Sequence, residues 1–209
     1  MFGRPSLPPE FSVGGGGVCR FASFPGYPPL FVSSIEELDA SLLNAKLLLC
    51  PHCKRSGTFI GHGFLRGYAE HGSERVIRGR RLFCSDRFLR QGCGRTVAIL
   101  LDCVMPRFNV RAATLFAFAK AVVEGTSRRA AWLGAAVSAA SLSSGYRLWG
   151  RLLGAQCYLR TKLTSLGSPP ASAMTEPLAQ LLEHFASALA ICNGPFEQFQ
   201  SQLQCVLLP

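Results

Sequence analysis

The order of apolar and polar positions divides the chain into a strand-rich segment and a helical segment. Residues 58–68 and 74–83 are rich in aromatic and β-branched side chains, and residues 69–73 between them have the composition of a turn. This pattern is typical of a β-hairpin. Residues 96–101 form a shorter apolar run, which predicts a third and more buried strand. We therefore expect a small β unit that ends at Pro106.

Beyond Pro106, apolar residues recur at the spacing of an α-helix. We predict five helices in this part of the chain, over residues 110–124, 128–137, 142–163, 176–191 and 195–205. The third of them has large apolar residues at spacings of four, three and four, which predicts a buried stripe formed by Leu142, Tyr146, Trp149 and Leu153.

The N-terminal part of the chain is expected to be a flexible leader followed by one short helix. Residues 1–33 are rich in proline and glycine, which argue against a packed element. Ser34 and Glu37 then match a capping box, the usual start of a helix. The apolar side of this helix would be formed by Ile35, Leu38, Leu42 and Leu43.

The charge of the chain points to a polyanionic partner. The 209 residues carry a formal net charge of +10, and 18 of the 22 basic residues are arginine. Residues 54–111 hold twelve basic and four acidic side chains, and residues 112–166 hold seven and one. The guanidinium group suits phosphates and guanine edges better than an ammonium group does. Nucleic acid is therefore the first expected partner, and an anionic membrane surface is the second.

The nine cysteines are best explained by a reducing compartment. Their number is odd, and the first eleven residues lack the apolar stretch of a secretory signal. No run of about 18 uninterrupted apolar residues is present, so we expect no membrane-spanning helix and no membrane partner. These features predict a cytoplasmic protein, associated with the nucleoid if the source is bacterial.

Four of the cysteines have the spacing of a zinc site. Cys50 and Cys53 form a CPHC knuckle, and Cys84 and Cys93 would supply the partner pair, with Gly94 allowing the turn around the metal. Eight residues separate the second pair instead of two, so this loop has to bulge out. Four thiolates leave no open position for water, so the expected Zn²⁺ is structural and not catalytic.

Other ligand sets remain open at this stage. A histidine or a further cysteine could replace one of the four thiolates, and a site without metal is the remaining alternative. The competing ligands are His52, His62, His71 and Cys103. Cysteines outside the four are expected to be small apolar residues, inert in a reducing cell.

Two groups of basic residues are candidates for nucleic-acid contacts. The first lies on and beside the predicted hairpin and comprises Arg75, Arg78, Arg80, Arg81, Arg87, Arg90 and Arg95. The second lies on the predicted second and third helices beyond Pro106 and comprises Arg128, Arg129, Ser143, Ser144, Arg147 and Arg151. Short hydroxyl side chains followed by arginines one turn apart suit a recognition helix. The alternative is that both groups are ordinary solvated faces.

Four sequence segments together resemble a known family. They are CPHC at 50–53, RRLFC at 80–84, GCGRTVAILL at 92–101 and PRFNVRAATL at 106–115. They are similar to the zinc-ribbon plus helix-turn-helix region of bacterial transposases and related transposon-encoded proteins. The resemblance implies an α+β fold in which a small N-terminal zinc β-ribbon is followed by an all-α, helix-turn-helix-like domain.

The expected organisation has four parts. Residues 1–33 are the leader, 34–106 the short helix with the zinc-ribbon, 107–166 the helix-turn-helix-like segment, and 167–209 C-terminal helices. The last part contains no lysine or arginine and is rich in glutamine, which fits homodimerisation.

The function expected from these features is DNA binding, as an accessory or remnant of a transposase, or as a regulator. Catalysis is not expected, because a DDE nuclease needs three metal-binding carboxylates and no aspartate follows Asp102. The alternatives are a protein-interaction module and an RNA-binding protein, since nothing in the sequence separates duplex DNA from RNA.

Overall fold

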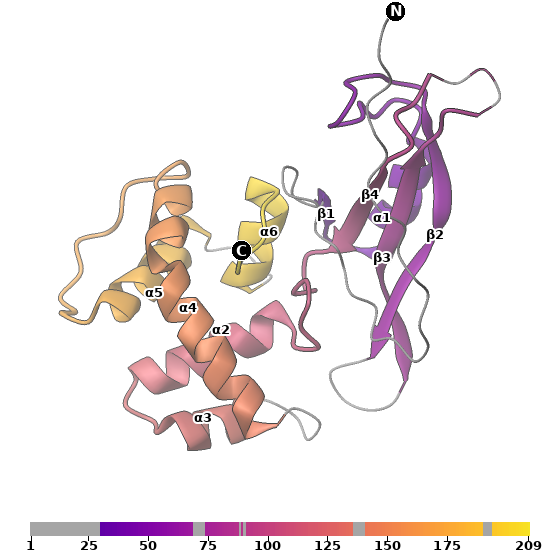
Figure 1. The fold of residues 1–209 in the computed structure, drawn as a ribbon. Coiled ribbons are helices and arrows are strands. Elements are labelled where there is room, and N and C mark those ends of the chain that lie inside the picture. The colour runs from indigo at the N-terminus through magenta and orange to yellow at the C-terminus, as the bar shows by residue number, and fades with distance from the viewer. Residues whose placement is uncertain (1–29, 69–73, 88, 90, 136–140, 190–193) are drawn as a thin grey trace, which may run out of the picture.

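The computed structural model (Figure 1) describes residues 30–68, 74–87, 89, 91–135, 141–189 and 194–209. Within these residues the chain forms a four-stranded sheet and six helices. The elements in chain order are β1 (Leu30–Val32), α1 (Ile35–Leu43), β2 (Phe59–Tyr68), β3 (Arg75–Cys84), β4 (Thr96–Leu101), α2 (Ala112–Val123), α3 (Arg128–Ala135), α4 (Leu142–Leu163), α5 (Pro177–Ala188) and α6 (Pro195–Leu203). The predicted hairpin, third strand and helices are thus confirmed, with ends that differ by a few residues.

The sheet is mixed, with the strand order β1-β4-β3-β2. Strands β2 and β3 form the long antiparallel hairpin, and β4 pairs antiparallel with β3. Strand β1 pairs parallel to β4, with Phe31 opposite Leu100. This strand lies in the segment that was expected to be an unstructured leader, and the rest of that leader lies outside the described residues.

Helix α1 covers one face of the sheet next to the cysteine cluster. Ser34 caps it by accepting a hydrogen bond from the backbone N–H of Glu37, as the capping box predicted. Leu38 is fully buried against the sheet, where it joins a small core with Leu82 and Ile99. Burial of such side chains is the main source of stability here, at about 1.5–3 kcal/mol for each.

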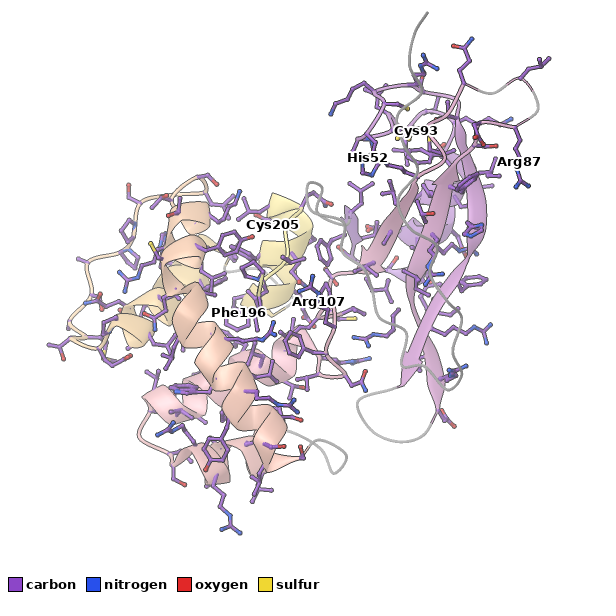
Figure 2. The ribbon with its side chains drawn as sticks, viewed as in Figure 1. His52, Arg87, Cys93, Arg107, Phe196 and Cys205 are labelled. Atoms are coloured by element: carbon purple, nitrogen blue, oxygen red, sulfur yellow. The ribbon has the colours of Figure 1, made fainter. Side chains whose placement is uncertain are left out.

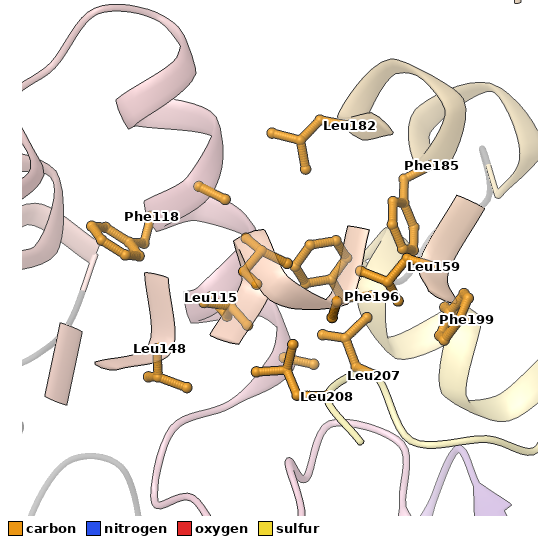
Figure 3. Close-up of a cluster of buried hydrophobic side chains, with 14 of the residues drawn as sticks. Leu115, Phe118, Leu148, Leu159, Leu182, Phe185, Phe196, Phe199, Leu207 and Leu208 are labelled. Atoms are coloured by element: carbon orange, nitrogen blue, oxygen red, sulfur yellow. The ribbon is translucent and has the colours of Figure 1, made fainter. Parts of the chain in front are cut away.

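The helices α2 to α6 share a second and larger core beside the sheet. Figure 3 shows its centre, where aromatic side chains of different helices meet edge to face. Phe185 lies 4.7 Å from Phe196 between ring centroids, and Phe118 lies 5.1 Å from Trp132. Such pairs add to the stability gained from area burial.

The buried stripe of α4 differs from the predicted one. Tyr146 and Leu153 are 49% and 41% exposed, so the prediction that they lie in the core is wrong. The buried positions are Gly145, Leu148, Leu152, Ala155, Leu159 and Leu163. The stripe is rotated because Gly145 packs directly on Trp132, where an added Cβ would lie 2.6 Å from the indole ring.

Two glutamine side chains join the C-terminal segment to the sheet. The Gln204 amide donates to the backbone oxygen of Phe31 at 2.9 Å and accepts from its N–H at 2.7 Å, as a neighbouring strand would. Gln200 is fully buried and donates to the backbone oxygens of Asp102 and Val104. The glutamine-rich end is therefore used at least partly within the chain, and its predicted role in dimerisation stays a prediction.

The expected architecture is wrong as a whole, although the class is α+β. A small N-terminal zinc-ribbon followed by a separate all-α helix-turn-helix domain would leave the sheet and the helices as successive units. Instead β1 extends the sheet in parallel with β4, and the end of the chain returns to β1. The sequence pattern missed this because a contact over 173 residues leaves no local signal.

Candidate metal centre and arginine surfaces

Four cysteines converge at one end of the sheet. Cys50 and Cys53 lie in the loop after α1, Cys84 ends β3, and Cys93 comes shortly before β4. Their sulfur atoms all lie within 4.8 Å of one another, so the cluster could hold a metal ion. Figure 2 shows this end of the molecule, where Cys93 and His52 are labelled. These are the four residues that the sequence predicted as ligands.

Two backbone turns hold the cysteine pairs. In the first, the N–H of Lys54 donates to the oxygen of Cys50 at 2.8 Å, and Lys54 adopts a left-handed conformation with φ of 60°. In the second, the N–H of Gly94 donates to the oxygen of Cys84 at 2.9 Å, with φ of 71° at Gly94. Glycine is the residue that enters this conformation without strain.

The long spacing of the second pair is absorbed by a closed loop. The N–H of Gly92 donates to the oxygen of Ser85 at 2.9 Å, so the residues between them leave and return at one point. An added Cβ at Gly92 would lie only 2.2 Å from that oxygen, which explains the glycine. Cys93 therefore reaches the cluster although eight residues separate it from Cys84.

Hydrogen bonds favour ionisation of one thiol in the cluster. Burial raises the pKa of Cys84, but Thr58 Oγ1 at 3.2 Å and the N–H of Cys93 at 3.3 Å outweigh this effect, and its pKa falls to about 7. Burial and the neighbouring thiols raise the pKa of Cys93 to about 12. A bound cation would favour the thiolate form of these cysteines, since metals bind the deprotonated thiol.

The competing ligands lie elsewhere or have other neighbours. His52 Nδ1 lies 3.1 Å from Nη1 of Arg95, and the ring of His62 packs against Phe83. Cys103 follows β4 and lines a separate cavity. His71 lies outside the described residues. Within the described part of the chain, the four-cysteine group is the one that could hold a metal.

Two of the hairpin arginines hold the fold together. Arg78 is 9% exposed and donates hydrogen bonds to the backbone oxygens of Met105 and Phe108. Arg80 forms an ion pair with Asp39 of α1 at 2.7 Å, and its guanidinium lies 4.0 Å from the centre of the Phe64 ring. The sequence placed both among the nucleic-acid contacts, but Arg78 does not reach the surface.

The remaining predicted arginines of the sheet region are spread along its length. Arg75 and Arg81 are exposed on β3, and Arg87 and Arg95 are exposed near the cysteine cluster. Arg90 lies outside the described residues. Arg55, which the prediction left out, also lies at this end and donates to the backbone oxygen of Gln91 at 2.6 Å. Its position beside the CPHC knuckle was the signal that could have found it.

The predicted helical contacts gather on α3 and α4. Arg128 and Arg129 begin α3, and Arg147 and Arg151 lie one turn apart on α4, all four exposed. We call these four residues the arginine face. The guanidinium of Arg128 lies 5.9 Å from the Tyr146 ring, which brings α3 and α4 side by side.

The two predicted serines lie at the start of α4, beside the arginine face. Ser143 is exposed and Ser144 is half-buried. Ser141 caps the helix by accepting a hydrogen bond from the N–H of Ser144, and Nε of Arg147 donates to the backbone oxygen of Ser143. Arg151 lies 5.3 Å from the Phe108 ring, which links the arginine face to the segment leaving the sheet. Arg107 in that segment, labelled in Figure 2, is a further exposed cation that periodicity did not reveal.

Comparison with known protein families, characterised proteins and solved structures gives no match to this chain. In the described residues, no helix has both the length and the apolar character needed to cross a membrane.

Proposed function

We propose that this protein binds nucleic acid, with duplex DNA as the first candidate, and that a structural zinc ion stabilises the sheet. The observation that carries the proposal is the arginine face, where four exposed guanidinium groups lie on two adjacent helices. None of the four forms an ion pair with an acidic side chain of the described residues. Arginines in this arrangement supply the phosphate contacts that dominate affinity for nucleic acid.

The sulfur distances support zinc as the metal. Zinc binds four thiolates at about 2.3 Å in a tetrahedron, which places neighbouring sulfur atoms about 3.8 Å apart. Cys50 and Cys93 have their sulfurs 3.7 Å apart, and so do Cys53 and Cys84. A disulfide would need about 2.05 Å. With four protein ligands the ion has no open position, so its role would be structural.

The negative charge of such a metal site would weaken nucleic-acid binding at the end of the sheet where the cysteines lie. The helices are therefore the better candidate for the nucleic-acid surface. Zinc with four thiolates carries two net negative charges. Arg55, Arg95 and Lys54 lie beside the cluster and would offset these charges. In the part of the chain that the structure describes, no ion pair joins an acidic side chain to the arginine face, and Glu124 is paired with Lys120.

Exposed glycines on α4 support close approach by a large partner. Gly150 and Gly154 lie in the middle of a helix on the exposed side, where an added Cβ would meet nothing within 4 Å. Each costs the helix about 1 kcal/mol relative to alanine. Packing within the chain does not explain why glycine stands at these positions. A phosphate backbone that lies along the helix between Arg147 and Arg151 would explain it, because a larger side chain would obstruct the contact.

The test is fluorescence anisotropy of the full chain with a short duplex DNA, at two salt concentrations. If the four arginines each contact a phosphate, affinity falls about 150-fold between about 50 mM and about 200 mM salt. Duplex RNA and single-stranded DNA serve as comparison probes, because nothing on the arginine face distinguishes them in advance. The proposal would be contradicted if the affinity for each of the three probes hardly changed with salt concentration.

The resemblance to transposon-encoded proteins supports a narrower proposal, that the protein acts as a transposase accessory or regulator in the cytoplasm. The supporting residues are the CPHC knuckle and the CGRT segment after it, at 50–53 and 93–96. An accessory or regulator of this kind has to recognise a defined DNA sequence. Selection of binding sites from random duplexes tests this role and should yield one enriched sequence.

A protein-docking role is the second candidate, favoured by exposed leucines next to the cysteine cluster. Leu43, Leu47 and Leu49 are 83%, 78% and 65% exposed, within seven residues of each other. Substitution of all three by serine would abolish binding to a protein partner and leave DNA binding intact.

A further inference from the structure

A cavity of about 400 Å³ lies beside β3, the end of β4 and the segment that leads to α2. Its volume falls in the range of small-molecule sites, roughly 300–1,000 Å³. Most of its wall is aliphatic, with Val76, Val104 and Val110 among the lining side chains. This wall offers an apolar surface that is open to solvent on one side.

The polar part of the wall contains a buried cation without a counter-charge. Arg78 is 9% exposed, and its three hydrogen-bond acceptors are the backbone oxygens of Met105 and Phe108 and the Oδ1 of Asn109, all neutral. No carboxylate in the described residues forms an ion pair with Arg78. Burial lowers its pKa accordingly. An unpaired buried charge is costly, so an anion is the missing partner.

The second arginine of the cavity is matched within the chain. Arg111 lies close enough to Glu197 to lower the pKa of that carboxyl, against the larger effect of burial, which raises it. Arg78 is therefore the cation of the cavity wall for which the described residues supply no ion pair. A ligand with a single negative charge would balance it.

We propose that this cavity binds a small organic monoanion with a carboxylate head and an apolar body. Arg78 has five N–H groups and uses three of them in its hydrogen bonds to Met105, Phe108 and Asn109. Asn109 accepts through Oδ1, which leaves its amide hydrogens to donate. Arg78 and Asn109 both line the cavity, so their remaining N–H groups would bind the carboxylate, and the aliphatic part of the wall would cover the apolar body. None of the four residues of the arginine face lines this cavity.

The test is titration calorimetry of the full chain with octanoate, and with octanol as the neutral probe of equal length. Octanoate should bind roughly tenfold or more tightly than octanol, because a charge-assisted hydrogen bond replaces a neutral one. Val76→Trp fills the cavity from its exposed edge and should abolish binding. Ile60→Trp, a similar change on exposed β2 outside the cavity, should leave binding unchanged.

A pair of arginine variants tests the head group. Arg78→Met should make octanoate and octanol bind equally, whereas Arg80→Met on the same strand should keep the preference for octanoate. If Arg78→Met does not fold, the test depends on the affinities of the unchanged protein for octanoate and octanol and on the loss of binding in Val76→Trp. Absence of octanoate binding, equal binding of both probes to the unchanged protein, or binding that survives Val76→Trp would each overturn the proposal.

Discussion

Two arginines of the sheet, Arg78 and Arg80, have surroundings opposite to those of the arginines of α3 and α4. In the sheet, Arg78 is buried under the segment that leads to α2, and Arg80 pairs with Asp39 of α1. On the helices, Arg147 and Arg151 are exposed beside glycines that leave open space. The same residue type therefore stabilises the fold at Arg78 and Arg80 and is exposed on α4, where we propose that it contacts nucleic acid. Basic residues identify a binding surface only after those with internal partners are removed.

The largest effect is expected from substitution of a cysteine in the cluster at the end of the sheet. Cys84→Ser should abolish stoichiometric zinc binding and lower the free energy of unfolding by more than about 4 kcal/mol, because the small core at this end depends on the ion. Metal analysis and urea unfolding measure both effects. Cys157→Ser on the exposed side of α4 is the control and should change neither. Full zinc content in Cys84→Ser would contradict the assignment of this ligand.

The next test separates the two groups of arginines by stability. Arg78→Met leaves buried carbonyl oxygens without a donor and should cost about 3 kcal/mol. Arg147→Ala removes an exposed side chain and should change stability by less than about 0.5 kcal/mol. Urea unfolding of both variants gives the comparison. Equal losses of unfolding free energy in the two variants would contradict the distinction between a structural arginine in the sheet and an exposed arginine on α4.

Alanine substitutions at the glycines of α4 should have smaller effects on stability, and the sign should differ between exposed and buried positions. Gly150→Ala and Gly154→Ala should each stabilise the chain by up to about 1 kcal/mol and weaken DNA binding, because a methyl group then stands in the contact surface. Gly145→Ala is the contrasting variant and should destabilise, since its Cβ would clash with Trp132. Unchanged DNA affinity in both exposed variants would remove the glycine argument.

The smallest expected effect is a pH dependence at the junction of the two regions. Burial raises the pKa of Asp102 and of Glu197 above their ordinary values. Ionisation of each is thus harder in the folded chain than in the unfolded chain. Their contribution is most favourable at low pH, and stability is lost as pH rises from the unfolded pKa of about 4 through the raised folded value. Asp102→Asn should reduce this slope in unfolding experiments between about pH 4 and about pH 7. An unchanged slope would show that Asp102 does not contribute to it.

Local patterns predicted most of the elements and the four cysteines that cluster. The hairpin, β4 and the helices follow from periodicity and capping residues, which act over a few positions. The cysteines were found by their CPHC and CG patterns, and the closure between Ser85 and Gly92 explains why the unusual spacing is tolerated. These features depend on neighbours in sequence, which is why the sequence reveals them.

Contacts between distant segments could not be predicted in the same way. The sequence placed Arg78 and Arg80 among the nucleic-acid contacts but did not show that the segment before α2 covers Arg78 or that Asp39 of α1 pairs with Arg80. The pairing of Gln204 with Phe31, and the packing of Gly145 on Trp132, likewise depend on the three-dimensional arrangement. Tyr146 was misplaced because an aromatic side chain is stable in the core and at the surface alike.

The most direct test of the central claim is the salt dependence of duplex DNA binding after Arg147→Ala and Arg151→Ala are combined. The control is Lys120→Ala with Lys162→Ala, which removes two exposed positive charges elsewhere on the helices. The slope of log affinity against log salt should decrease in magnitude by about 1.8 in the arginine variant, or about 0.9 for each lost phosphate contact, and by much less in the control. An equal change in both variants, or none in the arginine variant, would contradict the account.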